Sequence, residues 1–545
     1  MTKAARVRRA RTVATVLALM AAVLVVGAPP ASALTCTLNG HVVNASVQQT
    51  GDDFPILVRD SGELIFTDQD CGPISQIDTV NVDMGHAETS FDVDLRGGPI
   101  GPGFTPEDDG TSEIEIDFTN ADPHGGLTVI GTSGDDDVTF GQRLVPIVFV
   151  FERQANLNAG AEGSSPDVDV TWRSSGGSGF LSMGGNDRLR ATGIGTGTSD
   201  AATQTVDYFD GSGTDRFVGG AGDDNFFSNQ RSPNDVFDGG AGSDTVQMDR
   251  PAGVSITENG VADDGEECPG VGCEGDDIGA DVERISTGQG PDHLVGAPGH
   301  QEFFPGGGDN TVFGGPGNDL IFATGDDADL MHGGAGTDRV SYSGHQQAVT
   351  VTLDGKPNDG ATAAEGDNVF SDVEAVEGSS FGDQIRGGPG DDHLCGEVGN
   401  DLLCGGGGND VLDGGRCGTG TEFVADGSDS LSGGSGTDTV VEAGHDGNLV
   451  LSIDGVANDR VAGHPGEGTD NIALDVENVV AGADTIRGSA ANNRLEGRGG
   501  GDDLQGLAGN DRLIGGAGGD SLDGGAGTDT CLQGPGTGPK TSCEH

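Results

Sequence analysis

The chain has 545 residues, of which 102 are Gly and 22 are Pro, so nearly a quarter of it consists of residues that interrupt helices. A large helical protein is therefore excluded. The formal charge is −63, from 26 Lys and Arg against 89 Asp and Glu, which argues against a nucleic-acid partner. With 33% hydrophobic residues, the apolar content is too small for several ordinary packed cores. Either the chain is disordered or something neutralises its acids.

Residues 1–33 are predicted to be a signal peptide. Basic residues from Lys3 to Arg11 precede an apolar run from Val13 to Val26, and Ala31-Ser32-Ala33 supplies the small residues that a signal peptidase accepts. The run of about 14 apolar residues is shorter than the roughly 20 needed to cross a bilayer, so a membrane anchor is the weaker alternative. Cleavage after Ala33 would release a secreted, extracellular protein that begins at Leu34.

Residues 34–130 are predicted to form a β-rich N-terminal region without strict repeats. Alternating runs such as Phe91–Leu95 and Glu113–Phe118 have a period of two, which is typical of strands with one acid-rich face. Repeat-like units begin at Gly131, and residues 131–205 carry them in a degenerate form.

Residues 206–545 repeat a nine-residue pattern, G-G-x-G-x-D-x-U-x, in which U is a large apolar residue. Full copies start at Gly219, Gly239, Gly314, Gly333, Gly387, Gly405, Gly433 and Gly515. Near the C-terminus, units follow one another without a slip from residues 479, 488, 497, 506, 515 and 524. Such a run indicates a continuous repeat array.

This pattern resembles the RTX calcium-binding nonapeptide repeat of hemolysin-type secreted proteins. The resemblance implies an all-β fold, a parallel β-roll (a β-solenoid), in which positions one to six form a turn and positions seven to nine a short strand. The apolar residue at position eight would face the space between two thin sheets. Two units would make one turn of the roll, so position-six Asp residues 18 apart would be stacked about 4.8 Å apart. Carboxylates so close repel each other unless a hard cation lies between them, and calcium fits.

The position-six aspartates are the predicted calcium ligands. The best-formed pairs at 18-residue spacing are Asp383 with Asp401, Asp392 with Asp410, Asp484 with Asp502, Asp502 with Asp520, and Asp511 with Asp529. The array from residue 287 contains Asp292, Gln301, Asn310, Asp319, Asp329 and Asp338, and the array over 210–247 contains Asp215, Asp224, Asp235 and Asp244. Asp429 and Asp438 complete the predicted set.

The two earlier arrays are expected to bind calcium weakly or not at all. Gln301 and Asn310 reduce the charge of one array, which also has a one-residue slip near Thr324. The other array has a two-residue insertion before Gln230, which is expected to spoil the spacing. For every Asp in the set, the alternative is a solvated turn residue without metal.

A longer repeat interrupts the nonapeptides. Gly-Thr-Asp-x-Val occurs at Gly336 and Gly436, with a Ser variant at Gly242. Each copy is followed by an alternating stretch that predicts half-buried strands, and then by Asp-Val-Glu, which begins at Asp281, Asp372 and Asp475. Insertions that stay in the sheets of the roll are therefore predicted near 251–286, 342–377 and 442–478.

Nine Cys residues in a secreted chain predict disulfides and at least one unpaired thiol. Cys395 and Cys404, both at position nine of adjacent units, would lie on opposite sheets and should not pair with each other. Cys417 is the expected partner of Cys395, which leaves Cys404 as the spare thiol. Zinc is the weaker alternative, because no Cys-x-x-Cys pair occurs. The other pairs that the sequence favours are Cys36 with Cys71, Cys268 with Cys273, and Cys531 with Cys543, the last of which would cap the roll.

Catalytic motifs are almost absent from the sequence. There is no His-Glu-x-x-His, and the G-x-S-x-G string at Gly378–Gly382 falls in the Gly-rich turn of a degenerate unit. We therefore expect a non-enzymatic, extracellular calcium-binding protein whose roll folds on calcium. Its acidic face would contact cell-surface or matrix components, without a membrane span. The alternative is a secreted hydrolase whose unrecognised catalytic part lies in residues 34–205, with the repeats as a folding module.

Overall fold

The computed structural model describes the strands between residues 33 and 181, together with residues 187–191, 205–228, 234–266, 275–361, 365–415, 427–442, 449–461, 469–482 and 484–545. Every regular element in these residues is a β-strand. No helix long and apolar enough to cross a membrane occurs in the described part of the chain. The predicted signal peptide lies outside it, apart from Ala33, which begins β1 (Ala33–Asn39).

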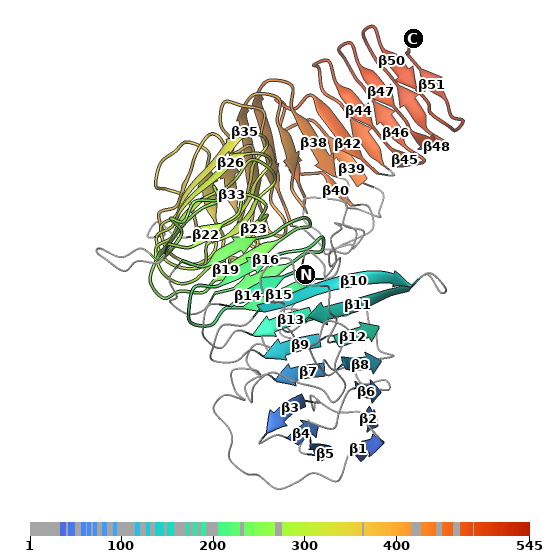
Figure 1. Ribbon diagram of the computed structural model, residues 1–545. Coiled ribbons are helices and arrows are strands. Elements are labelled where there is room, and N and C mark those ends of the chain that lie inside the picture. Colours follow the sequence, from blue (N-terminus) through green and yellow to red (C-terminus); the bar gives the residue numbers. More distant parts are fainter. Residues whose placement is uncertain are drawn as a thin grey trace.

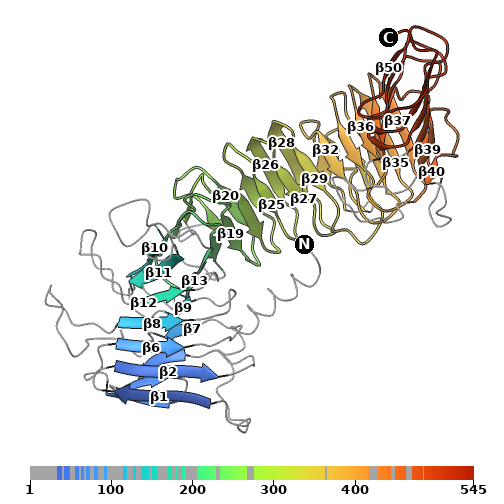
Figure 2. The ribbon, with the colours of Figure 1, turned by 90° about the vertical axis from the view of Figure 1, so that its right-hand side faces the viewer.

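The strands build an elongated, two-sided roll, with the N-terminal strands at one end and the C-terminal strands at the other (Figures 1 and 2). One side is a single sheet, here called the continuous sheet. From β7 to β50 every neighbouring pair in it is parallel. The continuous sheet contains β3 (Ile56–Asp60), β4 (Glu63–Phe66), β5 (Gln69–Pro73), β7 (Phe91–Asp94), β9 (Leu127–Ile130), β13 (Ser178–Leu181), β15 (Val206–Phe209), β17 (Asn225–Phe227), β19 (Thr245–Met248), β23 (Arg284–Thr287), β25 (Glu302–Phe304), β27 (Leu320–Phe322), β29 (Arg339–Ser341), β32 (Ala375–Glu377), β34 (His393–Cys395), β36 (Val411–Asp413), β38 (Thr439–Glu442), β42 (Asn478–Ala481), β44 (Arg494–Glu496), β47 (Arg512–Ile514) and β50 (Thr530–Leu532).

The opposite side of the roll is divided into four separate sheets, here called blocks. The first block contains β1, β2 (Val42–Gln48), β6 (Thr79–Asp83), β8 (Glu115–Thr119), β12 (Val170–Arg173), β11 (Val150–Asn156), β10 (Asp137–Val145), β14 (Arg188–Arg190), β16 (Arg216–Val218), β18 (Val236–Asp238) and β22 (Asp277–Ile278). The second contains β21 (Gly265–Glu266), β20 (Val254–Thr257), β24 (His293–Val295), β26 (Thr311–Pro316), β28 (Leu330–Ala335) and β31 (Asn368–Val369).

The third block contains β30 (Thr350–Thr352), β33 (Gln384–Arg386), β35 (Leu402–Gly407), β37 (Ser430–Ser435) and β41 (Asn471–Ile472). The fourth contains β40 (Arg460–Val461), β39 (Leu449–Ser452), β43 (Thr485–Arg487), β46 (Asp503–Gln505), β49 (Ser521–Asp523) and β51 (Lys540–Thr541). Two short turn strands, β45 (Gly499–Gly500) and β48 (Ala517–Gly518), pair at the edge of the roll. The all-β, parallel β-roll architecture is therefore confirmed.

The β-rich N-terminal region is part of the same roll. Its strand β2 pairs in parallel with β6, and β6 with β8, while β7 and β9 pair in parallel on the continuous sheet. The continuous sheet then passes without interruption through β13 to β15, the first strand of the nonapeptide part. The stacking of turns therefore begins well before the Gly-Asp repeats that mark it in the sequence.

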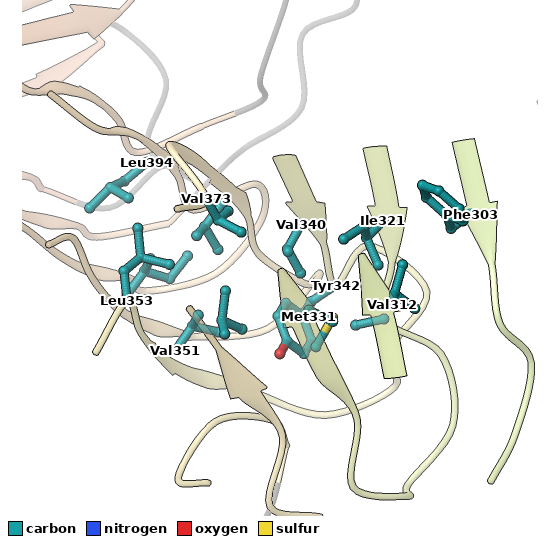
Figure 3. Packing of buried hydrophobic residues seen from close by; sticks show 14 of the residues in the cluster. Phe303, Val312, Ile321, Met331, Val340, Tyr342, Val351, Leu353, Val373 and Leu394 are labelled. Atoms are coloured by element: carbon teal, nitrogen blue, oxygen red, sulfur yellow. The ribbon is translucent and has the colours of Figure 1, made fainter. Parts of the chain in front are cut away.

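The core of the roll is a double row of side chains from position eight of successive units. Figure 3 shows Phe303, Ile321 and Val340 from the continuous sheet facing Val312 and Met331 from the second block. Each of these five side chains is completely buried. The predicted place of the apolar residue is confirmed along the whole roll: Phe217, Phe226, Phe237, Val246, Ile285, Leu294, Ile385, Leu394, Leu403, Leu412, Leu431, Val440, Ile486, Leu495, Leu504, Leu513, Leu522 and Cys531 are all 1% exposed or less.

Three insertions separate the blocks, and they share one design. In the second insertion, Asp359 is buried and its carboxylate accepts the backbone N–H groups of Thr352 (2.6 Å) and Val369 (2.9 Å). Asp264 makes the equivalent contacts in the first insertion and Asp459 in the third. Each such Asp therefore ties the first strand of one block to the last strand of the block before it.

Stacked turns leave no room for side chains at some glycines, which makes a substitution test possible. Gly518 has φ +155°, and a Cβ on it would lie 1.3 Å from the carbonyl oxygen of Gly500 in the turn below. Gly518→Ala is expected to lower the free energy of unfolding by at least the roughly 1–3 kcal/mol that a strained backbone costs. Gly501→Ala is the matched control, because its nearest neighbour would be 3.6 Å away. Urea unfolding in excess calcium measures both, and equal losses would contradict the stacking geometry.

Candidate metal centres

The position-six aspartates form ladders along the two edges of the roll. In the last array, the Oδ1 atom of Asp502 accepts the backbone N–H of Asp484 (2.8 Å), and that of Asp529 accepts the N–H of Asp511 (2.8 Å). Each carboxylate therefore binds the backbone of the turn before it. The same contact joins Asp383 to Asp401, Asp392 to Asp410, Asp502 to Asp520, Asp292 to Asn310, Gln301 to Asp319, and Asp319 to Asp338.

The ladder aspartates are buried. All of those predicted as ligands are 5% exposed or less, so none of them is a solvated turn residue. Their second carboxylate oxygen is the notable feature, because in many of them it is buried without a hydrogen-bond partner in the described residues. This holds for the Oδ2 atoms of Asp244, Asp292, Asp319, Asp338, Asp410, Asp438, Asp502, Asp511, Asp520 and Asp529. Unpaired buried carboxylate oxygens are costly, and they are the ligands that calcium prefers.

Glycine at position one gives the unpaired oxygen its space. A Cβ on Gly497 would lie 2.3 Å from Asp502 Oδ2, and one on Gly515 would lie 2.3 Å from Asp520 Oδ2. The Oδ2 atom therefore faces the Gly-rich start of its own turn, where only backbone is present. A Cβ on Gly506 would lie 2.4 Å from Asp511 Oδ2 and 2.5 Å from the carbonyl oxygen of Gly524, so carboxylate and backbone carbonyl oxygens meet at this glycine. This donor set fits a calcium ion.

The electrostatics of the ladders favour the uptake of a positive charge. Burial, together with repulsion from Asp520, raises the pKa of Asp502 to about 6, and burial with repulsion from Asp529 does the same for Asp511. Burial raises the pKa of Asp392 to about 7, and Asp410 and Glu374 add to this shift. Near neutral pH these buried carboxylates would therefore bind either a proton or a cation, because both neutralise their charge.

The ladder continues where the sequence spacing was expected to fail. Asp215 N–H donates to Asp235 Oδ1 (2.7 Å) and Asp224 N–H to Asp244 Oδ1 (2.7 Å), although each pair is 20 residues apart. The expectation that the insertion before Gln230 spoils the stacking is therefore wrong. The strands on either side of the insertion keep their pairing, β16 with β18 and β17 with β19, and so do the aspartates.

Two more ladder pairs span a longer interruption. Asp401 N–H donates to Asp429 Oδ1 (2.8 Å) and Asp410 N–H to Asp438 Oδ1 (2.9 Å), each across 28 residues. The one-residue slip near Thr324 is absorbed as well, since Asn310 N–H still donates to Asp329 Oδ1 (2.8 Å). Gln301 and Asn310 occupy ladder positions as the pattern predicts.

Several ladder residues lie outside the nonapeptide pattern, and the sequence pattern therefore did not predict them. Asp276, Asp367 and Asp470, from the insertions, accept the N–H groups of Asp235, Asp329 and Asp429. Glu544, near the C-terminus, accepts the N–H of Asp529 (2.7 Å). Their only sequence signal is their place one turn after a recognised unit.

A further acidic cluster lies at the N-terminal part of the repeats. Asp210, Asp215 and Asp235 are all buried, and ligand oxygens from the three lie within 4.8 Å of one another. Asp210 occupies position one, where the repeat normally has Gly, and its Oδ2 accepts the Ser228 hydroxyl (3.1 Å). The sequence pattern pointed to Asp215 and Asp235 but not to Asp210.

The cysteines agree with the predicted cap of the roll. Cys531 and Cys543 form a disulfide, with their Cα atoms 5.8 Å apart. Cys404 is free, and Cys395 takes part in a disulfide with a partner outside the described residues. Pairing of Cys395 with Cys404 is thus excluded as predicted, whereas its pairing with Cys417 stays a prediction. Cys268 and Cys273 lie outside the described residues, as do the side chains of Cys36 and Cys71.

Fold and site together define a parallel β-roll of nonapeptide units whose Gly-rich turns stack buried carboxylates into ladders. A family model described as the RTX calcium-binding nonapeptide repeat matches residues 209–230, 234–247, 304–340, 377–412, 424–441, 480–511 and 496–531. The chain therefore carries RTX calcium-binding nonapeptide repeats between residues 209 and 531, and these repeats support a calcium-binding β-roll protein. No curated protein matches the chain.

The two roles of the ladder carboxylates can be separated by substitution. Asp511→Asn keeps an oxygen that can accept the N–H of Asn493, whereas Asp511→Ala leaves that buried N–H without a partner. We expect Asp511→Ala to lose about 1–3 kcal/mol more unfolding free energy than Asp511→Asn in saturating calcium. Urea denaturation of both variants measures the difference, and identical stabilities would show that the hydrogen bond contributes nothing.

Proposed function

We propose that the protein is secreted and acts outside the cell by binding rather than by catalysis, with calcium holding its roll in the folded state. The observation that carries this proposal is the column of buried carboxylate oxygens without partners in the described residues, such as Asp502 Oδ2, Asp511 Oδ2 and Asp520 Oδ2. An unpaired buried carboxylate destabilises a fold unless a cation binds it. Because the ladders run along most of the roll, calcium would act on the fold as a whole.

The position-six aspartates would hold the calcium ions, together with backbone carbonyls of the Gly-rich turns. The strongest assignments are the pairs of the last array and the pairs that join Asp383 to Asp401 and Asp392 to Asp410, because each pair is stacked directly in successive turns. Bound calcium supplies positive charge between the stacked carboxylates. The side chains themselves supply the spacing, since each Oδ1 is held by a backbone N–H. The Oδ2 atoms of Asp502, Asp511, Asp520 and Asp529 are left for the cation, whereas those of Asp383 and Asp392 also accept the N–H groups of Ser379 (2.6 Å) and Gly388 (2.7 Å).

The surface supports a role in contact with cell-surface or matrix components. The chain carries a formal charge of −63, and in strands such as β46 and β49 the residues on either side of the buried core residue are partly exposed. A long, stiff, acidic rod suits multivalent binding to an extended, cation-rich surface better than it suits enclosing a small substrate.

The alternative function is that of a secreted hydrolase whose catalytic part would lie in residues 34–205. The G-x-S-x-G string does not favour it, because Gly378–Gly382 forms the turn before β33. In that turn the Ser379 hydroxyl donates to the Asp383 carboxylate (2.9 Å). A hydrolase would need a catalytic set in the N-terminal part of the roll instead.

Two measurements on the whole protein test the proposal. N-terminal sequencing of protein collected from culture medium should give Leu34, and a retained Met1 would contradict secretion through a cleaved signal peptide. The calcium-loaded protein should bind extracellular matrix or cell-surface preparations and should lack activity on a panel of ester, peptide and glycoside substrates. Turnover of any of these substrates that survives removal of trace contaminants would favour the hydrolase.

A further inference from the structure

Each nonapeptide array ends in the same way before an insertion. A Gly-rich turn closes with Asp244, Asp338 or Asp438, and the next turn on that edge of the roll is Asp-Val-Glu instead of another Gly-rich turn. We call these places the three junctions. Their Asp-Val-Glu segments, which begin at Asp281, Asp372 and Asp475, lie outside the residues that the family model matches.

The Glu of each Asp-Val-Glu segment takes the ladder position of a repeat Asp. Its Oε2 atom accepts the backbone N–H of the preceding ladder Asp, at 2.8 Å in the first junction and 2.9 Å in the second and third. The backbone follows the same path, because Arg284, Ala375 and Asn478 each donate their N–H to the carbonyl of that Asp. The junctions thus keep the ladder with a longer side chain and without a Gly-rich turn.

Unpaired oxygens gather at the junctions, as they do in the repeats. Asp244, Asp338 and Asp438 are 0–1% exposed, and the Oδ2 atom of each has no hydrogen-bond partner in the described residues. In the second and third junctions, the Oδ1 atoms of Asp372 and Asp475 are also buried without a partner.

Backbone oxygen from the Asp-Val-Glu segment reaches the same space. A Cβ on Gly333 would lie 2.6 Å from Asp338 Oδ2 and 2.3 Å from the carbonyl oxygen of Asp372. In the first junction, a Cβ on Gly239 would lie 2.7 Å from Asp244 Oδ2 and 2.6 Å from the carbonyl oxygen of Asp281. A carboxylate oxygen and a carbonyl oxygen therefore face the same glycine from two successive turns.

The junctions collect negative charge without a matching positive group. Burial, followed by repulsion from Asp224, Glu283 and Asp281, raises the pKa of Asp244 to about 8. Burial raises the pKa of Glu374 as well, and Asp338 and Asp372 add to the shift. Among the described residues, no Lys or Arg forms an ion pair with the ladder Asp or the Glu of any junction. At the second junction, His332 contacts Asp372 (3.2 Å).

We propose that each junction is a calcium site of its own, formed by the last repeat Asp, the Glu of Asp-Val-Glu and the backbone carbonyl beside it. This proposal rests on the proposed calcium-dependent function of the roll. It adds three sites with a mixed Asp and Glu donor set to the Asp–Asp pairs of the repeats. Calcium at these sites ties the roll to its insertions at the levels where the opposite sheet is interrupted.

The test compares two triple variants that remove the same charge. Glu283→Gln, Glu374→Gln and Glu477→Gln together keep an oxygen for the ladder hydrogen bond but remove three carboxylates at the junctions. Asp249→Asn, Asp263→Asn and Asp326→Asn together remove three exposed carboxylates and serve as the control. Bound calcium per chain is measured by atomic emission after equilibrium dialysis, with circular dichroism as the check of folding.

The junction variant should bind three calcium ions fewer than the wild type, while the control binds the full number. A folded junction variant with the full number would overturn the junction sites and leave the repeat sites standing. A wild type that binds no calcium would instead overturn the function on which the proposal rests. If the triple variant does not fold, each single Gln variant should fold and bind one ion fewer. A single variant that binds the full number, or that unfolds in saturating calcium, contradicts the proposal.

Discussion

Removal of calcium is expected to abolish most of the β-sheet circular dichroism signal of the roll, and addition of calcium is expected to restore it. Without metal, the chain must stack buried carboxylates while it buries only about one large apolar side chain per nine residues, against roughly 1–2 kcal/mol of backbone entropy per residue. A site with a dissociation constant near 10⁻⁴ M, at tenfold higher calcium, contributes about 1.4 kcal/mol. Several such sites together are comparable to the whole stability of a typical domain.

The measurement is a calcium titration of the chelator-treated protein, followed by far-ultraviolet circular dichroism, with magnesium as the control ion. Magnesium should fail because it demands a tighter, more regular geometry and gives up its water reluctantly. The double variant Asp502→Asn and Asp511→Asn should shift the midpoint to higher calcium and weaken the C-terminal array most. A complete β-sheet spectrum in excess chelator, unchanged by calcium, would refute the calcium-coupled mechanism and leave the β-roll fold intact.

Acid is expected to replace calcium in part, so that the metal-free roll is more folded at pH 5 than at pH 8. Burial raises the pKa of Asp224 and Asp392 to about 7 and that of Asp244 to about 8, from an ordinary value of 3.8. The folded state therefore keeps protons that the unfolded state has already lost. This stabilisation is complete below about pH 4 and is lost as the pH rises through about 6 to 8, which destabilises the metal-free fold.

A pH series in excess chelator from pH 4.5 to 8.5 tests this directly. The β-sheet signal should fall as the pH rises, whereas with saturating calcium it should stay constant over the upper part of the range. Calcium binding near pH 6.5 should also release protons, which calorimetry in buffers of different ionisation enthalpy detects. A metal-free signal that grows with rising pH would show that the ladder carboxylates are already ionised in the fold.

The repeat pattern predicts much of this architecture because one short rule is applied many times. A nine-residue unit with Gly at its turn, Asp at position six and an apolar residue at position eight determines both the core row and the ladder. Phe303 and Leu513, far apart in the chain, occupy the same place in the roll for this reason. Stacked pairs such as Asp511 with Asp529 follow from the same spacing.

The pattern could not predict the places where residues stack in successive turns although their separation in the sequence departs from 18 residues. The stacking of Asp401 on Asp429 depends on strand pairing and on one hydrogen bond, so the length of the intervening loop is free to vary. Glu374 reaches the ladder with a longer side chain, so a search for Asp at fixed positions misses it. In the N-terminal strands, such as β2 and β6, pairing runs over five residues, and the turns no longer need the Gly-Asp signature.

The division of one face into four blocks has a mechanical consequence. The hydrogen bonds of both sheets run along the axis of the roll, so a pull on its two ends loads them turn by turn. Within a block, the hydrogen bonds of two sheets, the continuous sheet and the block itself, share that load. At a junction only the continuous sheet passes through intact, and the insertion contributes a few local contacts, such as those of Asp359. A stretched molecule would therefore yield first at the three junctions, which would act as force-limiting links between stiffer segments.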